Sequence, residues 1–400
     1  ELHIDKTAEQ AVPGYYTTAF TNGIVTELTA TNAMAAEIFR FNRNIPATLW
    51  VDFASTFEGV ATCHYERVSD TCIEGYVQAK NVCGRGQYKL YFSLNTSHPF
   101  RLQEQQATTA TLKFDKEVRT VEVRIGLSPL STGLASQECS RWKGMSFSNL
   151  RLQALGQWKK QLQNIEVKGG EQDDKVIFYT SLYRTFLSPV DVTSPDGEYL
   201  GTDGKKYVSK DFRYYSNWSL WDTFRTKFPL LVLTEPVKMR DMATSLIHLY
   251  ATGKKDWSTG FESTPTVRTE HAVVLLLDTY RKGITNLDFR KGYAGMKEEM
   301  ERLPMRSPDQ KMESAYDLWA MAQIAGIIDE KADAELYMQR SASLFEETWK
   351  KEFMTVTPAF EVMKNNGLYQ GTRWQYRWAA PQYIDKMIEW VGKDSLLSQL

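Results

Sequence analysis

The spacing of the apolar residues changes near residue 150, and this change limits the folds open to the chain. Before it, short segments rich in Thr, Val, Tyr and Phe alternate with polar turns, as β-strands do. Beyond it, apolar residues recur at helical spacing between clusters of Gly, Pro and Asp. A chain of 400 residues is also too long for one ordinary core. The sequence therefore predicts a β domain followed by an α domain.

The first part indicates a β-sandwich over residues 1–148, incomplete at its N-terminal side. Residues 15–20 and 24–31 flank Asn22-Gly23, which is a strong hairpin signal. Further short strands are predicted over residues 48–53, 88–94 and 118–125. Several short strands between polar turns are typical of a sandwich.

The second part indicates a linker helix over residues 149–170, which ends near Gly169-Gly170, and helices from 171 to 400. One predicted helix starts at Pro236, and another, residues 270–282, is apolar nearly all round and therefore buried. Residues 312–327 and 334–349 resemble an antiparallel helix pair. Helices with short connections fit a bundle or an α/α toroid, and spacing alone does not choose between them.

Composition limits the partners of the chain. The formal net charge of -1 gives no reason to expect nucleic acid or an anionic membrane surface, and no apolar run is long enough to span a bilayer. Aromatic residues make up 12%, which suits stacking on sugar rings and buried aromatic cores equally well. The four cysteines match no zinc spacing, so one or two disulfides or free buried thiols are both open: Cys63, Cys72, Cys83 and Cys139.

Three dense groups of polar and aromatic residues could carry chemistry. In residues 214–225, Asp222 follows Trp221 and Arg225 comes three residues later, so a carboxylate for sugar hydroxyls would lie beside a stacking face. An ordinary Asp222–Arg225 pair on a helix surface is the alternative. In contrast, residues 191–197 suggest a β-turn, because the distal Glu of a calcium-binding EF-hand loop is absent.

The second group is residues 313–319, which we expect at the start of a helix. The alternative is that its acidic residues occur there only because the helix dipole favours them in the first turn. The third is residues 367–378, in which Gly371 allows an unusual backbone turn. This aromatic and polar segment suggests a loop that lines a substrate site.

These three segments resemble the signatures of glycoside hydrolase family 92, which are YYSxxSLWDTxRxxxPL, an EYAxDDW-like helix and YxEGNxWQYxWxxPHD. The similarity continues between and before them and covers nearly the whole chain. It includes residues 11–16, 27–31, 158–170, 178–183, 196–203 and 271–284.

The resemblance implies a β-sandwich joined by helices to an (α/α)6 toroid. It also implies an exo-acting, inverting α-mannosidase that uses calcium to hold and distort the terminal mannose. The family's glycine-rich opening and C-terminal third would lie outside these 400 residues. The base and the main calcium segments would then lie beyond Leu400, so no metal ligand is assigned within the chain, and these residues alone would be inactive. Location in the bacterial periplasm, at the cell surface or secreted is also implied.

One residue departs from the family pattern at the position of the general acid. The Glu of YxEGN is Gln370 here, and a carboxamide has no acidic proton to give. Losing a positioned acid costs about 10²–10⁴ in rate. A sugar alkoxide needs that proton to leave, whereas a phosphate departs as an anion, since even its second pKa is about 6. The substitution therefore predicts a mannose-α-1-phosphate diester as the scissile bond.

Arginines near this position would suit a phosphate. Arg373 and Arg377 follow Gln370, and Arg268 precedes His271. The alternative is that they are surface residues or partners of local carboxylates. From the motif matches we expect Asp222 to bind mannose hydroxyls, with Trp221, Arg225, His271, Arg373 and Trp374 as further substrate-binding residues.

Two other functions stay open. Leu318 and the Pro381-Gln-Tyr run replace family residues, which puts the ordinary mannosidase site in question. The protein could be an ordinary α-mannosidase of glycans whose acid comes from elsewhere, or a catalytically inactive mannoside-binding homologue. The base and calcium ligands expected beyond Leu400 separate these readings.

Overall fold

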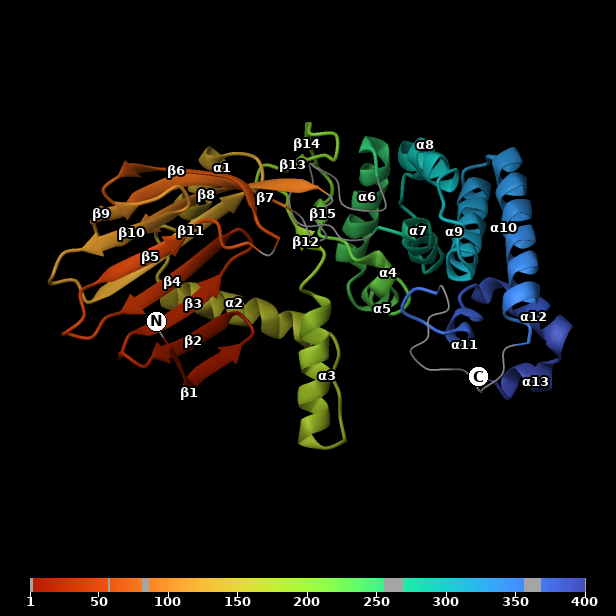
Figure 1. The fold of residues 1–400 in the computed structure, drawn as a ribbon, viewed down its shortest axis with the longest axis horizontal. Coiled ribbons are helices and arrows are strands. Elements are labelled where there is room, and N and C mark those ends of the chain that lie inside the picture. Colours follow the sequence, from red (N-terminus) through yellow and green to blue (C-terminus); the bar gives the residue numbers. More distant parts are fainter. Residues whose placement is uncertain (1–2, 57, 81–85, 255–268, 356–367, 400) are drawn as a thin grey trace. The chain divides into compact units, whose positions relative to one another are not determined.

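The computed structural model describes residues 3–56, 58–80, 86–254, 269–355 and 368–399 (Figure 1). The chain divides after Ser219 into two compact units. The first comprises Glu1–Ser219, and the second comprises Leu220–Lys255 and Thr269–Leu400.

The first unit contains two antiparallel sheets. The larger has eight strands in the order β1-β2-β3-β4-β11-β8-β7-β6, and the smaller has the order β5-β10-β9. Their bounds are β1 Ile4–Val12, β2 Tyr15–Phe20, β3 Val25–Ala30, β4 Met34–Arg40, β5 Thr48–Asp52, β6 Val60–Ser69, β7 Cys72–Lys80, β8 Gln87–Thr96, β9 Phe100–Gln105, β10 Thr109–Phe114 and β11 Thr120–Ser128. The predicted hairpin is confirmed as β2 and β3, with Gly23 at a φ of 85°.

Alternation of side chains gives this sandwich its core. Ile73 and Val121 of the large sheet and Leu112 of the small one are fully buried in a single apolar cluster. The other face of the large sheet buries Met34 and Ala36 against two helices, α1 (Thr132–Arg141) and α2 (Phe147–Leu162). The β-sandwich is thus confirmed. A helix follows it as expected, but α2 ends at Leu162 and not near Gly169-Gly170.

Over the described part of the chain, the cysteines are free thiols, one of the two alternatives left open by the sequence. Cys63, Cys72 and Cys139 are free, while Cys83 lies outside the described residues. Burial raises the pKa of Cys139 to about 11. This thiol is therefore an inert core group.

A third helix and four short strands complete the first unit. They are α3 (Gln172–Thr185), β12 (Val190–Asp191), β13 (Glu198–Leu200), β14 (Lys206–Val208) and β15 (Tyr215–Ser216). The turn predicted over residues 191–197 is present, since the N–H of Gly197 donates to the carbonyl of Ser194 at 3.0 Å. Gly197 has a φ of 85°, which a residue with a side chain rarely adopts.

The second unit is helical. Its elements are α4 (Leu220–Thr223), α5 (Lys227–Thr234), α6 (Pro236–Thr252), α7 (Ala272–Arg281), α8 (Phe289–Met300), α9 (Pro308–Ile327), α10 (Lys331–Glu352), α11 (Arg373–Tyr376), η2 (Pro381–Tyr383), α12 (Ile384–Val391) and α13 (Lys393–Leu397). None of the described helices is long and apolar enough to cross a membrane.

Several helix predictions are confirmed. Pro236 is the first residue of α6, α7 is buried on nearly every side, and α9 packs extensively on α10. One prediction is wrong: residues 313–319 do not start a helix. Ser307 and Pro308 begin α9 earlier, so Asp309 is the acidic residue of the first turn, and Glu313 lies beyond it.

The predicted domain limits stay a prediction. We expected the helical domain from residue 171, whereas the division into compact units falls after Ser219 and leaves α3 and β12 to β15 with the sandwich. Compactness and evolutionary domain limits need not coincide.

Candidate active site

The second unit brings together side chains from the three predicted segments and from the start of α7. Trp221 lies on α4, and Glu313 and Asp317 lie one turn apart on α9. His271 caps α7, and Tyr369 and Gln370 precede α11. Figure 1 shows these helices within the second unit.

Glu313 is the centre of this group. The indole Nε1–H of Trp221 donates to Glu313 Oε1 at 2.8 Å. A guanidinium nitrogen of Arg225 lies 3.6 Å from the same oxygen, and the guanidinium carbon of Arg225 lies 4.3 Å from the ring centre of Phe224. Burial raises the pKa of Glu313, while His271, Trp221 and Arg225 act to lower it. One carboxyl thus joins α4 to α9.

His271 lies behind Glu313 and is 3% exposed. Its Nδ1 is 3.0 Å from Asp317 Oδ1, and its Nε2 is 3.9 Å from Glu313 Oε1. Burial lowers the pKa of His271, but the two carboxylates outweigh burial, and the pKa is raised. The backbone of His271 has a φ of 65°, a conformation that costs a non-glycine residue about 1–3 kcal/mol.

The Gln370 loop is fixed from several directions. The N–H of Tyr369 donates to Asp309 Oδ2 at 2.7 Å, and the hydroxyl of Tyr376 donates to the carbonyl of Tyr369 at 2.6 Å. The Tyr369 ring meets the Trp221 ring edge to face, with ring centres 5.2 Å apart. Gln370 itself is exposed, and its Nε2 donates to the Tyr369 hydroxyl at 3.3 Å.

Backbone strain marks the same position. Gln370 has a φ of 49°, in the left-handed region. A Cβ on the next residue, Gly371, would lie 2.6 Å from Cε2 of Tyr376, so only glycine fits there without a shift. The sequence predicted an unusual backbone turn at Gly371, but the left-handed residue is Gln370, and Gly371 is required because its backbone lies close to a buried ring.

The arginines after Gln370 have other partners. Arg373 pairs with Glu352 at 3.0 Å, the alternative left open by the sequence. Arg377 is 1% exposed, and its guanidinium carbon lies 5.2 Å and 5.3 Å from the ring centres of Trp349 and Trp378. The expectation that Arg377 binds phosphate is wrong, because aromatic rings enclose its cation. Arg268 lies outside the described residues.

The remaining predicted site residues are close to this group in sequence and keep their predicted roles as predictions. Asp222 is exposed on α4, and Trp374 is half-buried on α11. His271 contacts protein groups and is buried, so any effect on a ligand would pass through its neighbours.

Glu313 and Asp317 lie within the predicted segment 313–319, but the sequence predicts no role for either. A usable signal was present: residues four apart lie on one helix face, so both carboxylates face the same way. Their partner His271 could not be found this way, because it is 46 residues from Asp317 in the sequence.

The family resemblance implies calcium, so the donor set matters. Within the described ranges, no group of three or more His, Cys, Asp or Glu side chains is placed to hold a metal ion. Calcium needs about six to eight oxygen ligands. We therefore assign no calcium ligand and no chemical step involving calcium to the described residues.

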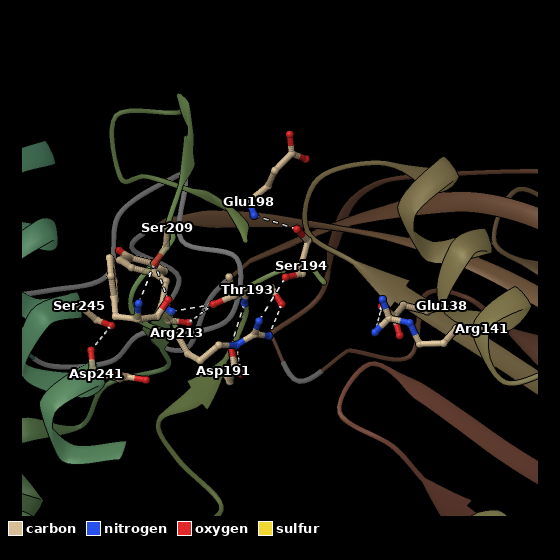
Figure 2. Close-up of polar contacts among 12 residues, drawn as sticks. Glu138, Arg141, Asp191, Thr193, Ser194, Glu198, Ser209, Arg213, Asp241 and Ser245 are labelled. Atoms are coloured by element: carbon tan, nitrogen blue, oxygen red, sulfur yellow. Dashed lines mark hydrogen bonds and ion pairs between the residues drawn. The ribbon is translucent and has the colours of Figure 1, made fainter. Parts of the chain in front are cut away.

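The first unit has a polar cavity of about 300 Å³ of its own. Arg213 lines it. Its guanidinium bonds to Asp191 at 2.8 Å and to the carbonyls of Thr193 and Ser194 at 2.8 and 3.3 Å (Figure 2). These bonds hold the 191–194 turn and occupy the guanidinium. None of the predicted site residues lines this cavity.

Comparisons with known proteins agree with the motifs. The profile of the glycosyl hydrolase family 92 N-terminal domain matches residues 1–128. That of the family 92 catalytic domain matches residues 134–312 and 305–400. No curated protein matches the chain.

Solved structures share the fold. The family 92 glycosyl hydrolase CcMan5 is 23% identical with a TM-score of 0.84, over 98% of this chain and 60% of that one. The α-mannosidase BT3965 from Bacteroides thetaiotaomicron is 21% identical with a TM-score of 0.83, over 99% and 60%. The inverting mannosidase BT2199 from Bacteroides thetaiotaomicron VPI-5482 is 21% identical with a TM-score of 0.81, over 100% and 61%.

The chain thus spans about 60% of the length of the solved structures that it matches. The structure agrees with the expected order of a β-sandwich followed by part of a helical toroid. Because the two family profiles together account for nearly every residue, the chain belongs to glycosyl hydrolase family 92, and it contains regions that match the family's N-terminal and catalytic domains.

Proposed function

We propose that the full-length protein releases terminal α-mannose with inversion and that the bond it cleaves is a mannose-α-1-phosphate diester. The observation that carries this proposal is Gln370, at the loop position where the family motif has its acid. Hydrogen bonds of Tyr369 hold the loop to Asp309 of α9 and to Tyr376, which supports a fixed position for the neighbouring Gln370.

The chemistry follows from the leaving group. Water attacks the anomeric carbon, the bond from that carbon to the phosphate oxygen breaks, and the phosphate monoester departs with the electron pair. The water proton goes to a base, which we expect beyond Leu400. No proton has to reach the leaving oxygen, because the monoester is a stable anion near neutral pH. A carboxamide at Gln370 is adequate for this reaction and inadequate for an alkoxide leaving group.

The charges near the Gln370 loop support phosphate binding by one arginine, Arg225. A carboxylate at position 370 would repel the diester, whereas the amide Nε2–H of Gln370 can donate to a phosphate oxygen. Of the arginines considered, Arg225 has a half-exposed side chain and a long ion pair of 3.6 Å with Glu313. We therefore assign phosphate binding to Arg225 ahead of Arg373, which has an ion pair of 3.0 Å.

Membership of the family supports two further parts of the proposal. Calcium would bind segments other than the described residues and would hold the terminal mannose. The substrate would be a mannose-containing glycan or a mannosyl phosphate outside the cytoplasm, in the periplasm or at the surface of a bacterium.

The test uses the full-length protein with calcium. Mannose-α-1-phospho-6-mannose and α-1,2-mannobiose are supplied separately, and proton NMR follows the first anomer of mannose released. Rapid release of β-mannose from the diester alone is expected. Preference for mannobiose would instead indicate an ordinary α-mannosidase with another acid. Release from neither, with retained mannoside binding, would indicate an inactive binding homologue.

A further inference from the structure

A continuous line of contacts runs from the interior of α9 to the Gln370 loop. Asp317 contacts His271 at 3.0 Å, and His271 lies 3.9 Å from Glu313. Glu313 accepts the indole N–H of Trp221 at 2.8 Å, and the Trp221 ring meets the Tyr369 ring. Every member lies in the second unit.

Three nitrogen-bearing groups lie near one oxygen of Glu313. The Trp221 N–H, the Arg225 guanidinium and the imidazole Nε2 of His271 all lie within 3.9 Å of Oε1. Among the described residues, Nε2 of His271 is buried without a hydrogen-bond partner. An ionised carboxylate beside it is the group that such a nitrogen would favour.

The hydrogen bond between Trp221 and Glu313 can do more than join two helices. An indole can sit in several rotamers, and a single hydrogen bond from its N–H to a fixed acceptor selects one of them. The acceptor is fixed in turn, because Glu313 lies on the long helix α9 and is only 14% exposed at its side chain. Trp221 is half-buried, and its ring meets that of Tyr369, the residue before Gln370.

We propose that Glu313 is a positioning residue that orients the Trp221 indole, so that the Trp221–Tyr369 face receives the mannosyl ring next to Gln370. This inference rests on the proposed function, since it assumes a mannoside ligand. Glu313 itself does not touch the substrate. Losing it would weaken ligand binding through a misplaced aromatic face and leave the chemical step nearly unchanged.

Four variants of the full-length protein test the proposal: Glu313→Gln, Glu313→Leu, Trp221→Phe and the double variant Trp221→Phe/Glu313→Leu. Gln keeps an acceptor oxygen for the indole, Leu removes it, and Phe removes the donor while keeping a ring. Glu335→Leu, at an exposed position of the neighbouring helix α10, is the matched control. KM and kcat are measured on whichever of the diester and mannobiose the wild type cleaves.

Glu313→Leu and Trp221→Phe are each expected to raise KM about tenfold, the size of one hydrogen bond to a charged group, with kcat within about threefold. The double variant should be no worse than Glu313→Leu alone, because the bond that Trp221→Phe removes is already absent there. Glu313→Gln should restore KM to within about threefold of the wild type. Additive effects in the double variant, or an unchanged KM in Glu313→Leu, would overturn the proposal.

The two proposals fail separately. If the wild type prefers mannobiose, the leaving-group proposal fails and the KM test proceeds on mannobiose. If it cleaves neither substrate, Kd for methyl α-mannoside by calorimetry replaces KM, and a wild type that binds no mannoside overturns both. If Glu313→Leu does not fold, Glu313→Asp, which withdraws the oxygen by one carbon, is measured in its place with the same expectation.

Discussion

The indole N–H of Trp221 donates a 2.8 Å hydrogen bond to Oε1 of Glu313, across 92 residues of sequence. The bond links the short helix α4 to the long helix α9. On the interior side of Glu313, His271 lies 3.9 Å from this carboxylate and 3.0 Å from Asp317, so polar contacts connect the interior of α9 to Trp221.

The Asp317–His271 pair should be visible in the pH dependence of stability. The pKa of His271 is raised in the folded protein, so the pair stabilises fully below the unfolded value of about 6.5, and this contribution is lost as pH rises through the folded pKa. Asp317→Asn should lower the free energy of unfolding by about 3 kcal/mol at pH 6, and above about pH 6.5 this free energy should fall less steeply with pH than in the wild type. Chemical denaturation at several pH values measures both effects.

The control for this variant is Asp278→Asn, which removes an exposed ion pair with Lys282 and should cost less than about 1 kcal/mol. Burial also raises the pKa of Glu313. This shift also makes the free energy of unfolding fall as pH rises, but the fall begins at a lower pH and occurs in both the wild type and Asp317→Asn. An Asp317→Asn protein with the pH profile of the wild type would show that the pair does not hold the His271 proton.

Gly371→Ala should disturb the Gln370 loop. The new Cβ would lie 2.6 Å from the ring of Tyr376, which is buried and bonded to Tyr369, so the loop must move. We expect a loss of about 1–3 kcal/mol in stability and at least about tenfold in kcat/KM. Gly326→Ala on α9, where a Cβ meets nothing, should be neutral or stabilise by up to about 1 kcal/mol. Equal behaviour of the two variants would contradict a tightly fixed loop.

The order of sandwich, helix and helical region could be predicted from the sequence, because strands and helices have different periods and Pro236 and Asn22-Gly23 are local signals. The family motifs also placed Trp221, Arg225 and Gln370 in the segments that meet in space. These features depend on neighbours within a few residues.

What the sequence did not predict depends on distant partners. Arg377 and Arg373 look alike in the motif, yet one packs among indoles and the other pairs with Glu352. The role of Glu313 needs Trp221 and His271, which are distant in sequence and reach it only through the packing of α4 and α7 on α9. The start of α9 was misplaced because the apolar pattern begins at Met312, after the polar first turn.

Arg225→Gln should weaken binding of the diester. A hydrogen bond to a charged group contributes about 1.5–3 kcal/mol, so KM for the diester should rise about tenfold or more while KM for mannobiose changes less. The control is Arg373→Gln, which removes an exposed ion pair with Glu352. We expect this change to raise KM for the diester by at most about threefold. A larger rise in KM for Arg373→Gln than for Arg225→Gln would instead assign phosphate binding to Arg373, on α11.

Gln370→Glu should shift the preference of the enzyme between leaving groups. A carboxyl at this position can donate a proton to an alkoxide and, when ionised, repels a phosphate. Its kcat/KM on the diester should fall about tenfold, and that on mannobiose should rise, by up to about 10²–10⁴ if the acid is well placed. Unchanged rates on both substrates would show that position 370 does not face the leaving group.

The most direct measurement is the ratio of kcat/KM for mannose-α-1-phospho-6-mannose to that for α-1,2-mannobiose, determined with the unmodified full-length protein and calcium. Because the missing proton donor penalises only the alkoxide, a ratio above about 10² is predicted. A ratio below about one would contradict the assignment of a phosphate leaving group to the Gln370 site.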